Sequence, residues 1–112
     1  MLYDRVLRLR PDDPDVLYNY GLHLIETGEG ERACQLLNAA FAKEPGNFKL
    51  AAALGHALRA TNRFAFAEAL WRSLTTVMPD QAQPHYELGQ ALLGLARPED
   101  AVGSFRAALA VS

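Results

Sequence analysis

The feature that most constrains this 112-residue sequence is a period of 34 residues. A glycine, an alanine, a large apolar residue and a proline each recur at that spacing. The four sets are Gly21, Gly55 and Gly89; Ala33, Ala67 and Ala101; Leu37, Trp71 and Phe105; and Pro11, Pro45 and Pro79. Self-similarity at a fixed period of this length is the signature of stacked repeat architectures. The sequence therefore predicts three consecutive repeats.

Within each repeat the apolar residues follow two helical faces. In the first repeat they fall at i, i+3, i+4 and i+7, and then at i, i+4 and i+7: Leu17, Tyr20, Gly21 and Leu24, then Ala33, Leu37 and Ala40. These spacings each mark one side of an α-helix. The other two repeats show the same pattern, and no segment alternates with a period of two. We therefore predict an all-α fold built from antiparallel helix pairs.

The recurring residue types suit this packing. Glycine and alanine at facing positions allow two helices to approach closely, and the large residue beside them fills the remaining gap. The proline ends each second helix, because it disfavours the helical conformation in the residue before it.

These residues resemble the tetratricopeptide repeat family, whose pattern is a large residue, x2, Leu-Gly, x2, Tyr, then Ala, x3, Phe, then Pro. The matching segments are Leu17-x2-Tyr20-Gly21-x2-Leu24, Ala51-x2-Leu54-Gly55-x2-Leu58 and His85-x2-Leu88-Gly89-x2-Leu92. The resemblance covers nearly the whole chain and implies an α-solenoid, a right-handed superhelical stack of helix pairs. Tyr20, Ala51 and His85 depart from the pattern, so we expect looser packing around them.

The register divides the chain as one domain of three repeats and a fragment. Residues 14–47, 48–81 and 82–112 form the repeats, and residues 2–10 are expected to be a partial helix of a preceding repeat. The chain thus looks like a segment of a longer array or a short natural one. Stacked repeats need polar end caps, yet the last helix has an apolar side formed by Val102, Phe105, Ala108 and Leu109. Self-association through the ends is one expected consequence.

The turns between paired helices also differ. Gly28 suits a left-handed turn conformation and Asn62 tolerates it, whereas Ala96 does neither well. If Ala96 adopts a positive φ, the strain costs about 1 kcal/mol. We therefore expect the third hairpin to be the least rigid.

The net charge, the apolar runs and the cysteine content indicate which classes of partner and which cellular compartment to expect. A net charge of −2 argues against a nucleic acid or an anionic membrane as the main partner. The N-terminal residues lack the apolar core of a signal peptide, and no apolar run is long enough to span a membrane. Cys34 is the single cysteine, so no internal disulfide is possible and a cytoplasmic location is expected.

We find no residue pattern that indicates catalysis, a cofactor or a metal. None of His23, His56 and His85 lies at a recognised metal-ligand spacing from another ligand type. Cys34 has no local histidine to act as its base, so a plain, partly buried thiol is expected. The sequence also lacks the glycine-rich phosphate-binding and nucleophile-elbow motifs. We predict that the protein is not an enzyme.

The face of each first helix that points away from its partner helix is the candidate binding surface. At 100° per residue, this face can be assigned from the period. It comprises Asp15, Tyr18, Asn19 and Leu22; Lys49, Ala52, His56 and Arg59; and Gln83, Tyr86 and Gln90. The family resemblance implies that these helices line a concave groove. Small residues, Ala52, Ala53 and Ala60, are expected to form its open floor, with positive charge from Lys49, His56 and Arg59.

This chemistry predicts a protein–protein interaction scaffold that binds an extended or helical segment with some acidic character. Some family members clamp a C-terminal carboxylate with basic residues, and this face lacks that set. Two alternatives remain: a docking or regulatory segment of a larger enzyme, such as a bacterial transferase, and a small secretion chaperone.

Overall fold

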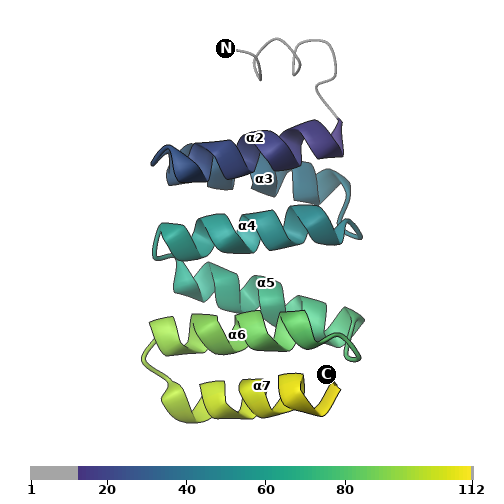
Figure 1. Cartoon of the computed structure of the whole chain (residues 1–112), viewed down its shortest axis with the longest axis vertical. Helices are drawn as coiled ribbons and strands as arrows, with labels where there is room; N and C mark the ends of the chain where they lie inside the picture. Colours follow the sequence, from purple (N-terminus) through teal and green to yellow (C-terminus); the bar gives the residue numbers. More distant parts are fainter. Residues whose placement is uncertain (1–12, 112) are drawn as a thin grey trace. The chain divides into compact units, whose positions relative to one another are not determined.

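The computed structural model describes residues 13–111, and these form six α-helices and no strand (Figure 1). The helices are α2 (Pro14–Glu26), α3 (Gly30–Lys43), α4 (Phe48–Ala60), α5 (Phe64–Val77), α6 (Ala82–Gly94) and α7 (Pro98–Val111). The predicted all-α fold is confirmed. The predicted partial helix at residues 2–10 lies outside the described residues.

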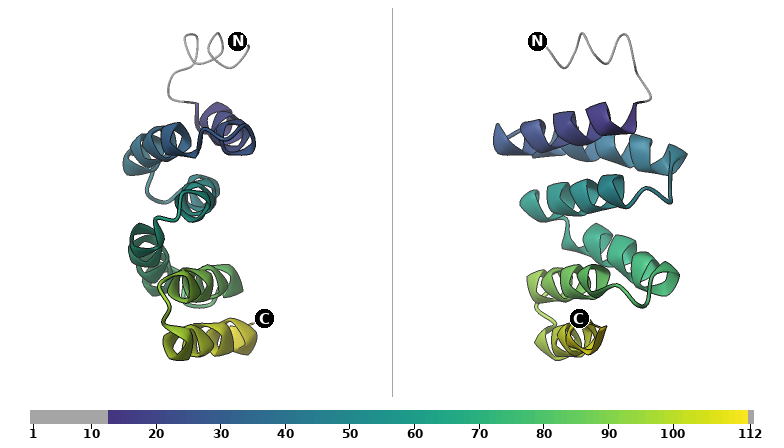
Figure 2. Two further views of the ribbon diagram at one scale, coloured as in Figure 1. Left: turned by 90° about the vertical axis from the view of Figure 1, so that its left-hand side faces the viewer. Right: turned by 45° about the vertical axis from the view of Figure 1, so that its right-hand side comes forward.

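The chain divides into two compact units. The N-terminal unit extends to Thr61 and holds α2, α3 and α4, which all pack against one another. In Figure 1, α2 and α4 lie nearer the viewer than α3, and the rotated views in Figure 2 place α2 and α4 on the same side of α3. The C-terminal unit begins at Asn62, and in it α6 packs against both α5 and α7.

Close helix contacts at glycine organise the hairpin of each unit. A Cβ atom added to Gly21 of α2 would lie 2.7 Å from the Leu37 side chain of α3. A Cβ atom added to Gly89 of α6 would lie 2.5 Å from the Phe105 ring of α7. The predicted pairing of a glycine with a large residue is therefore confirmed in both hairpins.

A second close contact joins each second helix to the first helix that follows it. In the N-terminal unit, Gly30 at the start of α3 leaves room for the Thr61 methyl group, which would lie 2.7 Å from an added Cβ. In the C-terminal unit the glycine is on the other helix of the contact. The large residue, Phe64, is at the start of α5, and its ring lies against Gly94 at the end of α6. Gly94 thus accommodates a neighbouring ring.

The first helices begin at positions 34 residues apart but are not capped alike. The Asp13 side chain accepts hydrogen bonds from the backbone N–H groups of Asp15 and Val16, at 3.0 and 3.4 Å. The Asn47 side chain accepts one from Leu50, at 3.3 Å. Gln81, at the equivalent position before α6, makes no such bond. An aspartate or asparagine side chain reaches these orphan N–H groups well, whereas glutamine is not among the preferred capping residues.

The three hairpin turns use the same backbone conformation with different residues. Gly28, Asn62 and Ala96 all have a positive φ, at 83°, 60° and 58°. The condition stated for Ala96 is therefore met, since this alanine lies in the left-handed region. An alanine there crowds its Cβ against the backbone, so the turn before α7 is the most strained of the three.

The three residues that depart from the family pattern, Tyr20, Ala51 and His85, each have defined neighbours or are buried in the structure. Tyr20 is buried, with the Arg32 guanidinium 5.5 Å from the centre of its ring. Ala51 is fully buried. The His85 Nε2 atom lies 3.0 Å from the Pro79 carbonyl oxygen, which places the imidazole against the turn before α6.

An ion-pair network fastens α5 to the turn before α7. The Glu68 carboxylate accepts hydrogen bonds from Arg72 at 2.8 Å and from Arg97 at 2.9 Å. Arg97 also donates to Asp100, at 2.9 Å. The hydrogen bond from Arg72, together with the charge of Arg97, lowers the pKa of Glu68 despite an opposing effect of burial.

Candidate functional site

In the N-terminal unit, the candidate face contains a cluster that joins α2 and α4. The Lys49 ammonium lies 3.6 Å from the Asp15 carboxylate and 5.3 Å from the centre of the Tyr18 ring. The Asn19 side-chain amide donates to the Asp15 carbonyl oxygen at 2.9 Å. Lys49 and Asp15 are both largely exposed, so water screens their attraction. The positive charge expected at Lys49 is partly offset by a neighbour that sequence reasoning did not pair with it.

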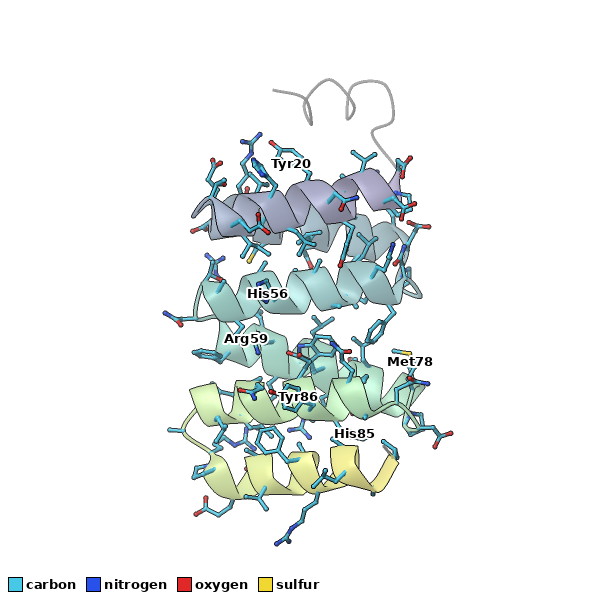
Figure 3. All side chains as sticks on the ribbon, viewed as in Figure 1. Tyr20, His56, Arg59, Met78, His85 and Tyr86 are labelled. Atoms are coloured by element: carbon cyan, nitrogen blue, oxygen red, sulfur yellow. The ribbon has the colours of Figure 1, made fainter. Side chains whose placement is uncertain are left out.

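The remaining candidate residues of this unit lie along α2 and α4. His56 is exposed, while Leu22, Ala52 and Arg59 are half-buried. Figure 3 shows His56 and Arg59 on α4. Ala53, which was expected in the open floor, is 2% exposed, and that expectation was wrong. Because α4 packs against both α2 and α3, its buried side is wider than the period of one hairpin indicates.

In the C-terminal unit, the candidate residues lie on α6. Gln83 is exposed, Gln90 is half-buried and Tyr86 is 48% exposed. The centre of the Tyr86 ring lies 5.7 Å from that of Phe105 on α7, with the two ring planes inclined by 52°. This tilted arrangement is typical of favourable aromatic contacts.

An open, mostly apolar hollow lies beside this aromatic pair. We name it the α6–α7 depression, and its volume is about 680 Å³. Its main lining residues are Gln83, Tyr86 and Glu87 of α6 and Phe105, Ala108 and Leu109 of α7. The sequence indicated an apolar side on the last helix. It did not indicate that α6 supplies the opposite wall, because that depends on the angle at which the two helices pack.

Within residues 13–111, the structure offers no set of three or more histidine, cysteine, aspartate or glutamate residues positioned to hold a metal ion. Cys34 is buried, and its Sγ atom lies 3.6 Å from the Thr61 hydroxyl. Among the same residues, no helix has the length and apolar character needed to cross a membrane.

Two family models described as the tetratricopeptide repeat match the chain, one over residues 1–54 and the other over residues 52–111. No curated protein matches the sequence.

Several solved structures share the fold. MamA from Desulfovibrio magneticus RS-1 aligns with 98% of this chain at 22% identity and a TM-score of 0.83. A thermophilic TPR protein of Thermus thermophilus aligns with 99% of it at 23% identity and a TM-score of 0.83. SycD, a type III secretion translocator chaperone of Yersinia enterocolitica, aligns with 87% at 14% identity and a TM-score of 0.78, and the match covers 74% of SycD. This chain spans 62% of that MamA chain and 63% of the Thermus protein, less than two thirds of either.

Proposed function

The chain belongs to the tetratricopeptide repeat family, and we propose that it is a non-enzymatic scaffold that binds peptides or helices of another protein. The proposed surfaces are the exposed faces of α2 and α4 in the N-terminal unit and, separately, that of α6 in the C-terminal unit. Repeats of this kind present many side chains on one regular surface, so they suit protein recognition.

One observation carries this proposal. The first helices bury one side completely, as at Leu24, Leu50 and Leu92, yet none of the candidate face residues is buried. These exposed faces combine aromatic rings, amide groups and basic groups, of which Tyr18, Gln83 and Arg59 are examples. Aromatic and arginine side chains contribute most of the binding energy in many protein interfaces.

The charge of the face favours a segment with acidic character. Lys49 lies beside Asp15, and this exposed pair is weak enough to exchange for a carboxylate of a ligand. His56 and Arg59 extend the basic row along α4 towards its C-terminal end. A ligand with one or two carboxylates among apolar residues would match this row.

A peptide-display screen on the immobilised chain, followed by calorimetry of the selected peptides, tests the proposal. We expect acidic, apolar peptides, and we expect Arg59→Glu to weaken their binding by roughly tenfold through the reversed charge. Arg106→Glu is the matched control, because Arg106 is an exposed arginine on α7, outside the candidate faces. Tyr86→Ala tests the face on α6. If neither Arg59→Glu nor Tyr86→Ala changes the affinity, the assignment to these faces is wrong.

The two alternatives from the sequence keep their own tests. The fold is shared with the SycD chaperone, but at 14% identity that likeness concerns the fold alone. A secreted substrate with an apolar segment that binds these faces would favour the chaperone alternative. A catalytic domain on the same gene product would favour the docking segment of a larger enzyme.

A further inference from the structure

We propose that Asp15 is an internal competitor for the ligand of the N-terminal unit. Its carboxylate holds the Lys49 ammonium in the free protein and must give it up to a carboxylate of the bound segment. This inference rests on the proposed function and deepens it. It assigns to Asp15 a role in specificity, because only a carboxylate on a segment that also fits the rest of the face would displace it.

The repeat itself brings the two groups together. Asp15 in the first turn of α2 and Lys49 in the first turn of α4 lie 34 residues apart, at the same repeat position. Because α2 and α4 pack against each other in the N-terminal unit (Figure 1), these equivalent positions become neighbours. The third residue at this position is Gln83, which carries no charge. One repeat position therefore holds an acid, a base and an amide, and the acid and the base meet on the candidate face.

The contact between Asp15 and Lys49 has the geometry of a loose pair. The Lys49 Nζ atom lies 3.6 Å from the Asp15 carboxylate, which is longer than a hydrogen bond between charged groups. By contrast, Glu68 of the C-terminal unit accepts from Arg72 at 2.8 Å, and its side chain is 20% exposed against 76% for Asp15. Water therefore weakens the attraction between Lys49 and Asp15 more than that of the Glu68 pair. A pair of this kind contributes little to folding and can exchange partners.

Each group has separate support that would remain after the exchange. The Lys49 ammonium lies 5.3 Å from the centre of the Tyr18 ring, a cation–π contact that keeps it over the face. The backbone of Asp15 is fixed independently, because its N–H donates to the Asp13 side chain and its carbonyl accepts from the Asn19 amide, at 3.0 and 2.9 Å. Only the Asp15 side chain has to rotate towards water, and its charge stays favourable at the start of α2.

This arrangement discriminates between ligands. A free anion has to break the pair of Lys49 and Asp15 with nothing else to hold it. A segment that already contacts the face through other side chains presents its carboxylate to Lys49 at a high effective concentration. An uncharged segment leaves the pair intact. Removing the Asp15 charge should therefore strengthen the binding of acidic segments and leave that of uncharged ones unchanged, although it deletes an ion pair of the protein.

Calorimetry with Asp15→Asn tests the inference, because asparagine keeps the shape of the side chain and removes its charge. The probe is the tightest acidic peptide from the display screen, and its analogue with amides in place of the acids is the control ligand. We expect the variant to bind the acidic probe about two- to fivefold more tightly, the range of an exposed ion pair, and to bind the analogue as the wild type does. Asp80→Asn removes an equal charge from an exposed site outside the candidate faces, in the turn before α6, and should leave both affinities unchanged.

A double-mutant cycle separates competition for Lys49 from general repulsion. Lys49→Met keeps most of the aliphatic stem and removes the ammonium, so it should weaken binding of the acidic probe several-fold. In that background, Asp15→Asn should produce no further gain, because there is no ammonium left to release. Both side chains are largely exposed, so circular dichroism should show all the variants folded.

Two results would overturn the inference while weaker binding to Arg59→Glu shows that the proposed function stands. One is equal or weaker binding of the acidic probe to Asp15→Asn, which would make the ion pair a part of the binding surface. The other is a gain from Asp15→Asn that persists with Lys49→Met, which would make Asp15 a general repulsive charge. A screen that yields no acidic peptide, or affinities that neither Arg59→Glu nor Tyr86→Ala changes, would overturn the proposed function and this inference together.

Discussion

The α2–α3 hairpin and the α6–α7 hairpin occupy equivalent repeat positions, yet they differ in the local features that stabilise a helix pair. The first has an aspartate cap before α2, a glycine in its turn and the helix α4 packed against it. In the second, the glutamine before α6 makes no capping hydrogen bond, the turn holds an alanine with a positive φ, and the α6–α7 depression lies open beside the helices. A shared repeat pattern therefore fixes how two helices pair, whereas the stability of each pair depends on its local residues and its neighbours.

The largest expected difference concerns the large residue of each hairpin. Leu37→Ala leaves a cavity in a fully buried site and should lower the free energy of unfolding by about 3 kcal/mol. Phe105→Ala removes a half-buried ring beside open space, and we expect a loss of about 1.5 kcal/mol. Urea unfolding followed by circular dichroism measures both, with Leu109→Ala as an exposed control. Equal losses for the two variants would mean that the depression does not alter the burial of Phe105 in solution.

The helix caps should produce the next largest effect. Asp13→Ala removes the side-chain acceptor at the start of α2 and should destabilise the protein by about 1 kcal/mol. Gln81→Asp places an acceptor where the backbone is already extended, and it should stabilise α6 by up to about 1 kcal/mol. Thermal unfolding of the two variants and of Gln81→Asn would measure this difference. A Gln81→Asp protein no more stable than the wild type would show that solvent already satisfies the start of α6.

The turn residues offer a smaller, reciprocal test. Ala96→Gly relieves the left-handed strain, though glycine also makes the unfolded chain more flexible, so a net gain of about 0.5 kcal/mol is expected. Gly28→Ala introduces the same strain in the first hairpin and should cost about 1 kcal/mol. Hydrogen exchange of the amides around each turn gives a local measurement. Slower exchange near Ala96 in the glycine variant would support the expectation that the third hairpin is the least rigid.

The ion-pair network should give the smallest effect, and its pH dependence has a defined sign. Because Arg72 and Arg97 lower the pKa of Glu68 in the folded state, the stabilisation is complete at pH 7 and is lost as the pH falls through that lowered pKa. Glu68→Gln should therefore reduce stability by about 0.5 kcal/mol at pH 7 and low salt. Unfolding curves for the wild type and the variant should converge once the pH lies well below the lowered pKa of Glu68. A difference that persists there would indicate that the amide disturbs packing instead.

Local patterns were sufficient to predict much of the fold. The spacing of Gly21, Leu37 and their equivalents indicated paired helices, and the α2–α3 and α6–α7 hairpins show these contacts. The register placed Ala96 at the turn position equivalent to Gly28 and Asn62, and all three residues have a positive φ. Such predictions succeed because the periodicity of a helix and the steric demands of a turn depend on residues close together in the sequence.

The candidate site was predicted less completely. Counting 100° per residue selected side chains that are exposed or half-buried with one exception. Ala53 was expected in the open floor of the groove and is buried. Counting 100° per residue considers only the two helices of one hairpin. Helix α4 also contacts α2 and α3, and these contacts bury more of its surface. The pairing of Lys49 with Asp15 was missed for the same reason, since the two residues lie on different helices.

The sequence by itself determined the repeat, the helices, the glycine contacts and the family of this protein, because each follows from spacing within one or two turns of chain or from the period. Only the tertiary structure decided which surfaces remain open. The exposure of Phe105 and Leu109 beside Tyr86 depends on whether a third helix packs across the hairpin, as α4 does across α2 and α3. Residues of the same type at the same repeat position can therefore lie in a core or at an open surface, according to what covers them.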